Sequence, residues 1–189
     1  VERFGEDPGS FAHRSVATGR SRAAYRRLAA AAETSRFVAT VATSRGVFTA
    51  ELFPEAAPAT VESFVSLARK GFFDDTTIHR VVPDFVVQAG DPRGDGTGGP
   101  GYALRDELNP IPYVRGRVGM ALSGPDTGGS QWFVALARQA HLDAGYTVFG
   151  EVASGMEVLD RIEQDDRLVS VRVTEGTREA PPGLAAPSR

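Results

Sequence analysis

Residues 78–101 read IHRVVPDFVVQAGDPRGDGTGGPG, and this is the densest stretch of the chain in residues that could carry chemistry. Two short apolar runs, residues 77–82 and 85–89, predict two β-strands that lead into a glycine-rich loop. Arg80 lies in the first run and Gln88 in the second. The stretch therefore favours a β-rich fold with polar side chains gathered beside a loop.

Strand alternation divides the side chains of the second run between two faces. If residues 85–89 form one strand, Phe85 and Val87 face one side, and Val86 and Gln88 face the other. Spacing alone does not tell which face would carry a site.

The segments around this stretch continue the β pattern. A hairpin is predicted where two β-type runs flank Ser44, Arg45 and Gly46. With the two runs above, the chain offers eight short strands, at residues 37–43, 47–53, 77–82, 85–89, 118–122, 132–137, 147–152 and 168–174. Many strands with few helices predict a mainly β protein, a closed eight-stranded antiparallel β-barrel capped by two α-helices.

Two helices are expected, one early and one late. Apolar residues recur at helical spacing over residues 61–68, with Pro58 near the start and Glu62 in the first turn. The second helix is expected to begin at Ser154, which forms a capping box with Glu157.

The two ends of the chain differ from the middle. Residues 1–35 include the Ala- and Arg-rich stretch 21–33, which predicts a helix with a thin apolar stripe in an N-terminal extension or linker. Residues 175–189 are proline-rich with few large apolar side chains, so we expect a flexible tail. The working domain is predicted at residues 36–174.

Composition excludes several classes of function. The net charge is -3 with a pI near 5.7, so there is no basic field for nucleic acid. No apolar run approaches the ~20 residues of a membrane span. Cysteine is absent, which removes disulfides, thiolate metal sites and a cysteine nucleophile.

Two further segments could carry chemistry. Residues 119–133, GMALSGPDTGGSQWF, lead from a strand through a Gly/Pro/Asp turn into a strand with Gln131 and Phe133. Residues 140–150, AHLDAGYTVFG, bring His141, Leu142 and Tyr146 into one loop. Loops of this kind expose main-chain donors and acceptors.

These three segments, in this order, resemble the bacterial-like members of the cyclophilin-type peptidyl-prolyl cis/trans isomerases. The family pieces FHRxxPxFxxQGGD, GTGG and GSQFF stand here as IHRVVPDFVVQAGD, GTGG and GGSQWF. The match covers roughly residues 36–174, and agreement in all three pieces is highly specific. The resemblance implies an enzyme that accelerates rotation about X-Pro bonds in proline-containing polypeptides and assists protein folding.

The resemblance also implies roles for individual residues. Arg80 matches the catalytic arginine, and the main chain at Leu122 would pair with the bound peptide. The other positions of the implied substrate site are Phe85, Val86, Leu142 and Phe133 in an apolar proline pocket, Gln88 and Gln131 as its polar neighbours, Ala121 with Leu122 along the groove, and His141 and Tyr146 beside it.

His141 and Tyr146 depart from the common family pattern. His141 stands where many members have tryptophan, and Tyr146 where many have histidine. Since the usual tryptophan donates an indole hydrogen bond to cyclosporin, we expect weak cyclosporin binding here.

Other readings of the same residues are less favoured. His79 suggests a general base, but isomerisation moves no proton, so a structural role is expected. His13, His79 and His141 show no metal-ligand spacing. The glycine-rich loop lacks the GK[ST] ending of a phosphate loop. We therefore expect no metal and no cofactor.

Two questions stay open at this point. A module that binds proline-containing segments with little turnover would use the same groove, although the presence of Arg80 favours an enzyme. Residues 1–35 could instead tether the barrel to another domain or to the cell envelope. The chain begins with Val1, which indicates a processed piece, and we expect a monomer in the bacterial cytoplasm or cell envelope.

Overall fold

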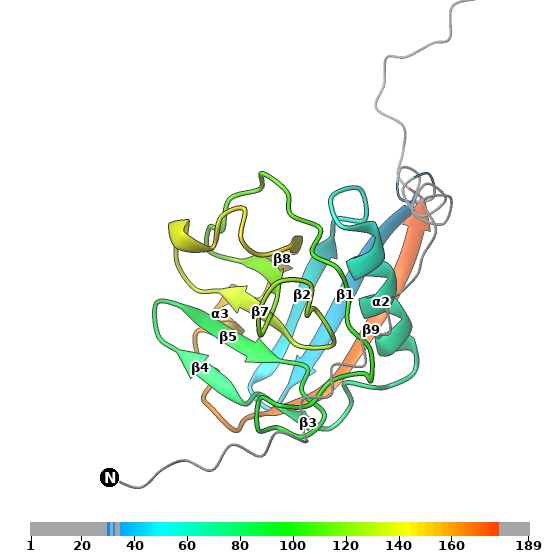
Figure 1. Ribbon diagram of the computed structural model, residues 1–189. Coiled ribbons are helices and arrows are strands. Elements are labelled where there is room, and N and C mark those ends of the chain that lie inside the picture. Colours follow the sequence, from blue (N-terminus) through cyan, green and yellow to red (C-terminus); the bar gives the residue numbers. More distant parts are fainter. Residues whose placement is uncertain (1–29, 31, 33–34, 178–189) are drawn as a thin grey trace, which may run out of the picture.

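The computed structural model describes residues 30, 32 and 35–177, and its main feature is one curled antiparallel sheet (Figure 1). The sheet order is β3-β9-β1-β2-β8-β6-β7-β5-β4. Its strands are β1 (Ser35–Thr43), β2 (Gly46–Leu52), β3 (Thr76–Thr77), β4 (Arg80–Val82), β5 (Val86–Ala89), β6 (Arg117–Met120), β7 (Trp132–Ala135), β8 (Val148–Ser154) and β9 (Arg167–Thr177). The mainly β prediction is confirmed.

The first and last strands of this order are consecutive parts of one bent segment. Thr76 and Thr77 pair with β9, and two residues later β4 pairs with β5. The main chain of Ile78 adds two bonds to the 165–166 turn, each with an N···O distance of 2.9 Å. The sheet is thus closed through the chain itself, and β3 and β4 together correspond to the single strand predicted at residues 77–82.

The helix α2 (Pro58–Arg69) forms where helical periodicity predicted it. Pro58 occupies the first turn, and a buried face including Val61, Phe64 and Val65 packs inward. Glu62 was expected in the first turn of this helix. The helix begins at Pro58, so Glu62 lies beyond the first turn. The carboxylate that serves the helix start comes from Glu107, whose two oxygens accept the N–H groups of residues 59 and 60 at 3.0 and 2.8 Å.

The second helix differs from its prediction. Helix α3 (Met156–Leu159) is four residues long and begins after Gly155, which has φ +84°. Ser154 does not cap it, because its hydroxyl pairs with that of Thr49 at 2.7 Å across the β2–β8 ladder. The capping box was therefore a wrong interpretation: Ser154 is the last residue of β8. One short 3₁₀ helix, η1 (Ala140–Leu142), lies in the loop before β8.

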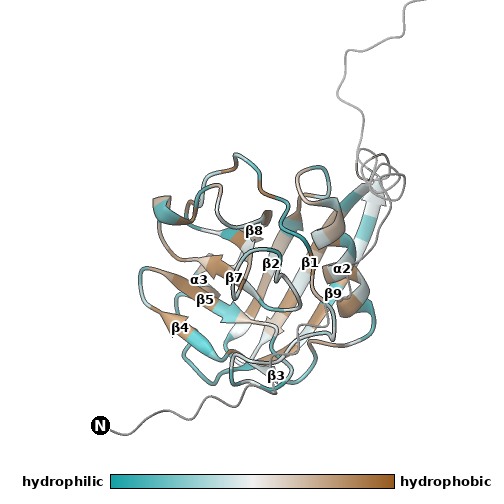
Figure 2. Ribbon diagram, viewed as in Figure 1, coloured by the Kyte–Doolittle hydropathy of each residue, from teal (hydrophilic) through white to brown (hydrophobic). Residues whose placement is uncertain are grey.

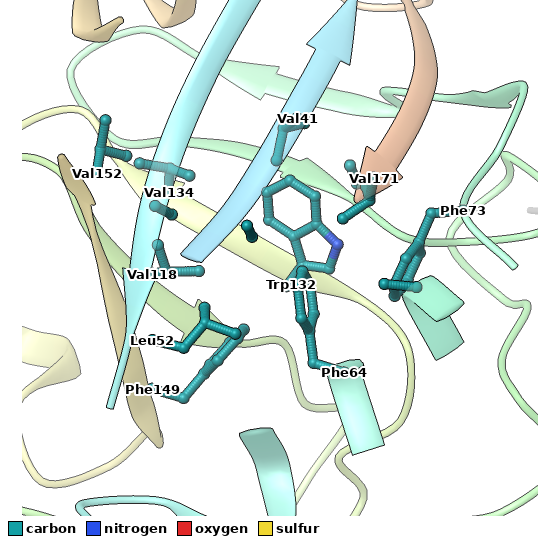
Figure 3. Close-up of a cluster of buried hydrophobic side chains, with 14 of the residues drawn as sticks. Val41, Leu52, Phe64, Phe73, Val118, Trp132, Val134, Phe149, Val152 and Val171 are labelled. Carbon is teal, nitrogen blue, oxygen red and sulfur yellow. The ribbon is translucent and has the colours of Figure 1, made fainter. Parts of the chain in front are cut away.

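Buried apolar side chains form two clusters. The larger fills the barrel and includes Phe64, Phe73, Trp132 and Phe149 (Figure 3). Phe64 of α2 reaches both Phe73 and Phe149, with ring centroids 5.2 and 5.5 Å apart. The smaller cluster consists of Val86, Tyr113, Phe133, Ala135, Leu142 and Val148. Hydrophobic residues recur along the strands and on α2 (Figure 2).

The domain limits are only partly visible. Strand β9 continues to Thr177, three residues past the predicted boundary, because Glu175, Gly176 and Thr177 still pair with β1. Residues 178–189 of the predicted tail lie outside the described residues. So does the helix predicted at 21–33, apart from Ala30 and Ala32.

Candidate functional site

A row of directly paired residues crosses four neighbouring strands. Arg80 of β4 pairs with Gln88 of β5, Gln88 with Phe133 of β7, and Phe133 with Gly119 of β6. Directly paired residues of antiparallel strands project to the same face of a sheet. The sheet register therefore collects an arginine, a glutamine and a phenylalanine from distant parts of the chain on one surface.

Hydrogen bonds hold the polar end of this row. Arg80 Nη1 donates to Gln88 Oε1 at 3.1 Å, and Gln88 Nε2 donates to Gln131 Oε1 at 3.0 Å. Gln131 Nε2 in turn donates to the carbonyl oxygens of Gly96 and Gly98, both at 2.9 Å. The chain of bonds orients the exposed guanidinium and ties it to the glycine-rich loop.

A pocket of about 100 Å³, with mostly apolar residues in its lining, lies beside the guanidinium. Its lining is Arg80, Phe85, Val86, Gln88, Ala121, Leu122, Phe133, Leu142 and Tyr146. Such a volume is small beside the ~300–1,000 Å³ of drug-sized sites, so it suits one small side chain.

Phe85 forms one wall of the pocket. The Arg80 guanidinium carbon lies 5.4 Å from the Phe85 ring centroid, in a cation–π arrangement. The imidazole of His141 stacks on the same ring, with centroids 5.5 Å apart and planes at 27°. His141 is exposed and sits at the rim of the pocket.

A second, larger cavity of about 490 Å³ adjoins the first and shares Arg80, Gln88, Ala121 and Leu122 with it. The glycine-rich loop, Ser123 and Thr127 supply much of its polar lining. Together the two cavities form a groove in which main-chain groups of the loops are within reach of an extended chain.

Phe85 lies on the other face from the one predicted by strand alternation. It was expected to share a face with Val87, yet it lines the pocket with Val86 and Gln88, while Val87 lies in the barrel core. The reason is that β5 begins only at Val86, and Phe85 belongs to the preceding turn, where Asp84 has φ +58°.

Most of the predicted substrate-site residues lie together in the structure. Two lie next to the small pocket and outside its lining: Gln131 lines the larger cavity, and His141 stacks on Phe85. The structure thus gathers all the predicted positions around one groove.

Asp91 was missed in the sequence. It is 0% exposed, and its carboxylate accepts the main-chain N–H groups of Arg93, Asp95 and Gly96. A Cβ on Gly98 would lie 1.9 Å from Asp91 Oδ1, which explains the glycine there. Asp91 thereby shapes the loop that Gln131 binds. An aspartate before Pro-x-Gly is a turn signal that could have revealed it.

His79 lines neither cavity of the site. Both ring nitrogens are buried. Burial lowers the pKa of His79, although the negative charge of Asp91 opposes this. A half-buried imidazole whose pKa is lowered fits the structural role expected for it.

Comparisons with known proteins converge on one family. The family model described as cyclophilin type peptidyl-prolyl cis-trans isomerase matches residues 38–181. Peptidyl-prolyl cis-trans isomerase B of Bacillus subtilis is 50% identical over 125 residues, which cover 65% of this chain and 87% of the relative. A peptidyl-prolyl cis-trans isomerase of Helicobacter pylori is 46% identical over 137 residues, 70% of this chain and 84% of the relative.

A solved structure agrees with these relatives. A cyclophilin-type isomerase of Cryptosporidium parvum, crystallised in the presence of the dipeptide Ala-Pro, superimposes with a TM-score of 0.68 at 27% sequence identity. The superposition covers 72% of this chain and 98% of that one.

Proposed function

Since this chain belongs to the cyclophilin-type peptidyl-prolyl cis-trans isomerases, we propose that it isomerises X-Pro bonds in the small apolar pocket beside Arg80. Its activity is peptidyl-prolyl isomerisation in protein folding, and it binds proline-containing polypeptides. The observation that supports Arg80 and its neighbours as the residues responsible is the guanidinium held by Gln88 beside the small pocket.

The reaction requires no bond cleavage. Amide resonance imposes a barrier of about 18–20 kcal/mol on rotation. A catalyst need only bind the twisted amide better than either planar isomer, and each ~1.4 kcal/mol of that preference gives about tenfold in rate. Groups that stabilise the twisted state are therefore sufficient.

Arg80 supplies the polar part of that stabilisation. A guanidinium carries five N–H donors, and the bond to Gln88 holds one of them. The others can donate to the prolyl nitrogen as it pyramidalises, or to the neighbouring carbonyl. A charge-assisted bond to that nitrogen withdraws its lone pair from resonance.

The apolar residues of the pocket bind the proline ring. Phe133, Phe85 and Leu142 hold the pyrrolidine ring, while main-chain groups of the groove fix the flanking peptide. One end of the amide is then immobilised while the other turns. A module that only binds proline-containing segments would also need this pocket. It would not need the Arg80 guanidinium that Gln88 holds beside it.

The experiment compares wild type with Arg80→Ala by exchange NMR on a short Xaa-Pro peptide. We expect Arg80→Ala to lose about a hundredfold in turnover, the usual cost of removing one transition-state donor, while it still binds the peptide. The matched control is Arg69→Ala on α2, whose side chain is 55% exposed and pairs with Glu175. If Arg80→Ala keeps wild-type turnover, Arg80 is not the catalytic group.

The oligomeric state and the location of the enzyme are also part of what we propose. We expect a monomer that acts without nucleic acid, in the bacterial cytoplasm or cell envelope. The exposed large apolar side chains of the described residues are few, namely Val47, Leu108, Val114 and Val169, which supports a monomer. None of the described helices is long and apolar enough to cross a membrane. Light scattering across a concentration series tests the monomer.

A further inference from the structure

Tyr113 lies beneath the pocket rather than in the barrel core. It is 0% exposed and belongs to the smaller apolar cluster with Phe133, Leu142 and Val86, which also line the pocket. Other fully buried aromatic residues, such as Phe73 and Phe149, belong to the larger cluster. Tyr113 itself does not line the pocket, so any effect on substrate must pass through its neighbours.

The ring of Tyr113 backs the ring of Phe133. Their centroids are 5.4 Å apart with planes at 25°, a stacked pair. Space for this stack exists because Gly119, the partner of Phe133 in the sheet, has no side chain. A Cβ at Gly119 would lie 2.3 Å from Tyr113 Oη and 2.6 Å from Phe133 Cζ.

The same residue anchors the loop at residues 138–147 that closes the pocket. Its N–H donates to Asp143 Oδ1 at 2.8 Å, and its carbonyl accepts the N–H of Gln139 at 2.8 Å. Its hydroxyl donates to the carbonyl of Thr147 at 3.1 Å. The loop between these anchors carries Leu142.

We propose that Tyr113 is a positioning residue that sets the Phe133 ring and the 138–147 loop against each other, and thereby the width of the pocket that grips proline. The inference rests on the proposed role of that pocket. Because the pocket holds the ring in the planar and the twisted states alike, loosening it weakens binding more than it slows the bound reaction.

Three variants separate this role from simple core packing: Tyr113→Leu removes the stack, Tyr113→Phe keeps the ring and removes the hydroxyl, and Phe73→Leu truncates an aromatic side chain in the other cluster. Peptide titration and exchange NMR, below the melting temperature of every variant, give KM and kcat separately. We expect Tyr113→Leu to raise KM about tenfold, the size of a lost aromatic pair, with kcat nearly unchanged. Tyr113→Phe loses only the bond to Thr147 and should raise KM less than Tyr113→Leu does, and Phe73→Leu should keep the wild-type KM.

A double-mutant cycle tests the shared space. Gly119→Ala should displace the Phe133 ring and raise KM, and Tyr113→Leu with Gly119→Ala should recover part of that loss, since leucine vacates the clashing position. The proposal is overturned if Tyr113→Leu lowers only the melting temperature, as Phe73→Leu does, if Tyr113→Phe raises KM as much as Tyr113→Leu, or if the cycle is additive. A failure of the pocket assignment looks different, because Arg80→Ala would then turn over like wild type.

Discussion

His79 is half-buried in the bent segment, next to the arginine that faces the substrate groove. Because burial lowers its pKa, the folded protein binds fewer protons at this residue than the unfolded chain does. The free energy of unfolding therefore falls as the pH drops below about 6.5, the ordinary pKa of histidine.

His79→Gln removes this titration. We expect its unfolding free energy to depend less steeply on pH between about 6.5 and 5 than that of wild type. Urea denaturation at a series of pH values measures the slope. Identical slopes for His79→Gln and wild type would refute the expectation.

His141 permits a prediction about inhibitor binding. It occupies the rim of the pocket, stacked on Phe85, where many relatives carry tryptophan. We expect weak inhibition by cyclosporin, and tighter inhibition of His141→Trp because the indole restores an N–H donor. Inhibition of X-Pro isomerisation measures both. Tight inhibition of wild type that His141→Trp leaves unchanged would contradict this.

The helix α2 depends on a residue far away in the sequence. Glu107 lies 48 positions after Ala59, yet its carboxylate accepts two of the N–H groups that a helix start leaves unpaired. We expect Glu107→Ala to lower the free energy of unfolding by about 1–2 kcal/mol, and Glu107→Gln by less, since an amide oxygen still accepts one bond. Urea midpoints at constant m measure the difference. Equal midpoints for wild type and Glu107→Ala would show that the cap is dispensable.

The accuracy of the sequence interpretation also varies by element. Eight strand positions and α2 were predicted because periodicity and turn residues are local signals. The start of α3 was wrong because Ser154 has a partner, Thr49, on another strand. The sequence motifs of the family identified the residues that the structure gathers around the groove. They did not identify Asp91, Glu107 or Tyr113, which hold the surrounding structure. For Glu107 and Tyr113 the role depends on long-range contacts, which a local pattern does not contain.

At the scale of the whole molecule, the pairing of β1 with β9 suggests where the domain ends. We expect a fragment of residues 35–177 to fold and to keep wild-type turnover, since it contains the whole closed sheet and both clusters. A fragment of residues 35–174, the predicted boundary, should melt at a lower temperature because it lacks three β1–β9 pairs and the Arg69–Glu175 ion pair. Thermal unfolding and exchange NMR measure both fragments. An unfolded 35–177 fragment would show that the domain also needs residues from 1–34 or from 178–189.

The bent segment from β3 to β4 has a consequence for a protein whose substrates are other polypeptide chains. An open sheet ends in edge strands whose free N–H and C=O groups can recruit an extended chain and seed aggregation. Here the two strands at the ends of the ladder are two and three residues long and run into one another. At these two ends an unfolded client therefore finds only two or three residues of strand edge to pair with, so β-augmentation there is too short to hold it.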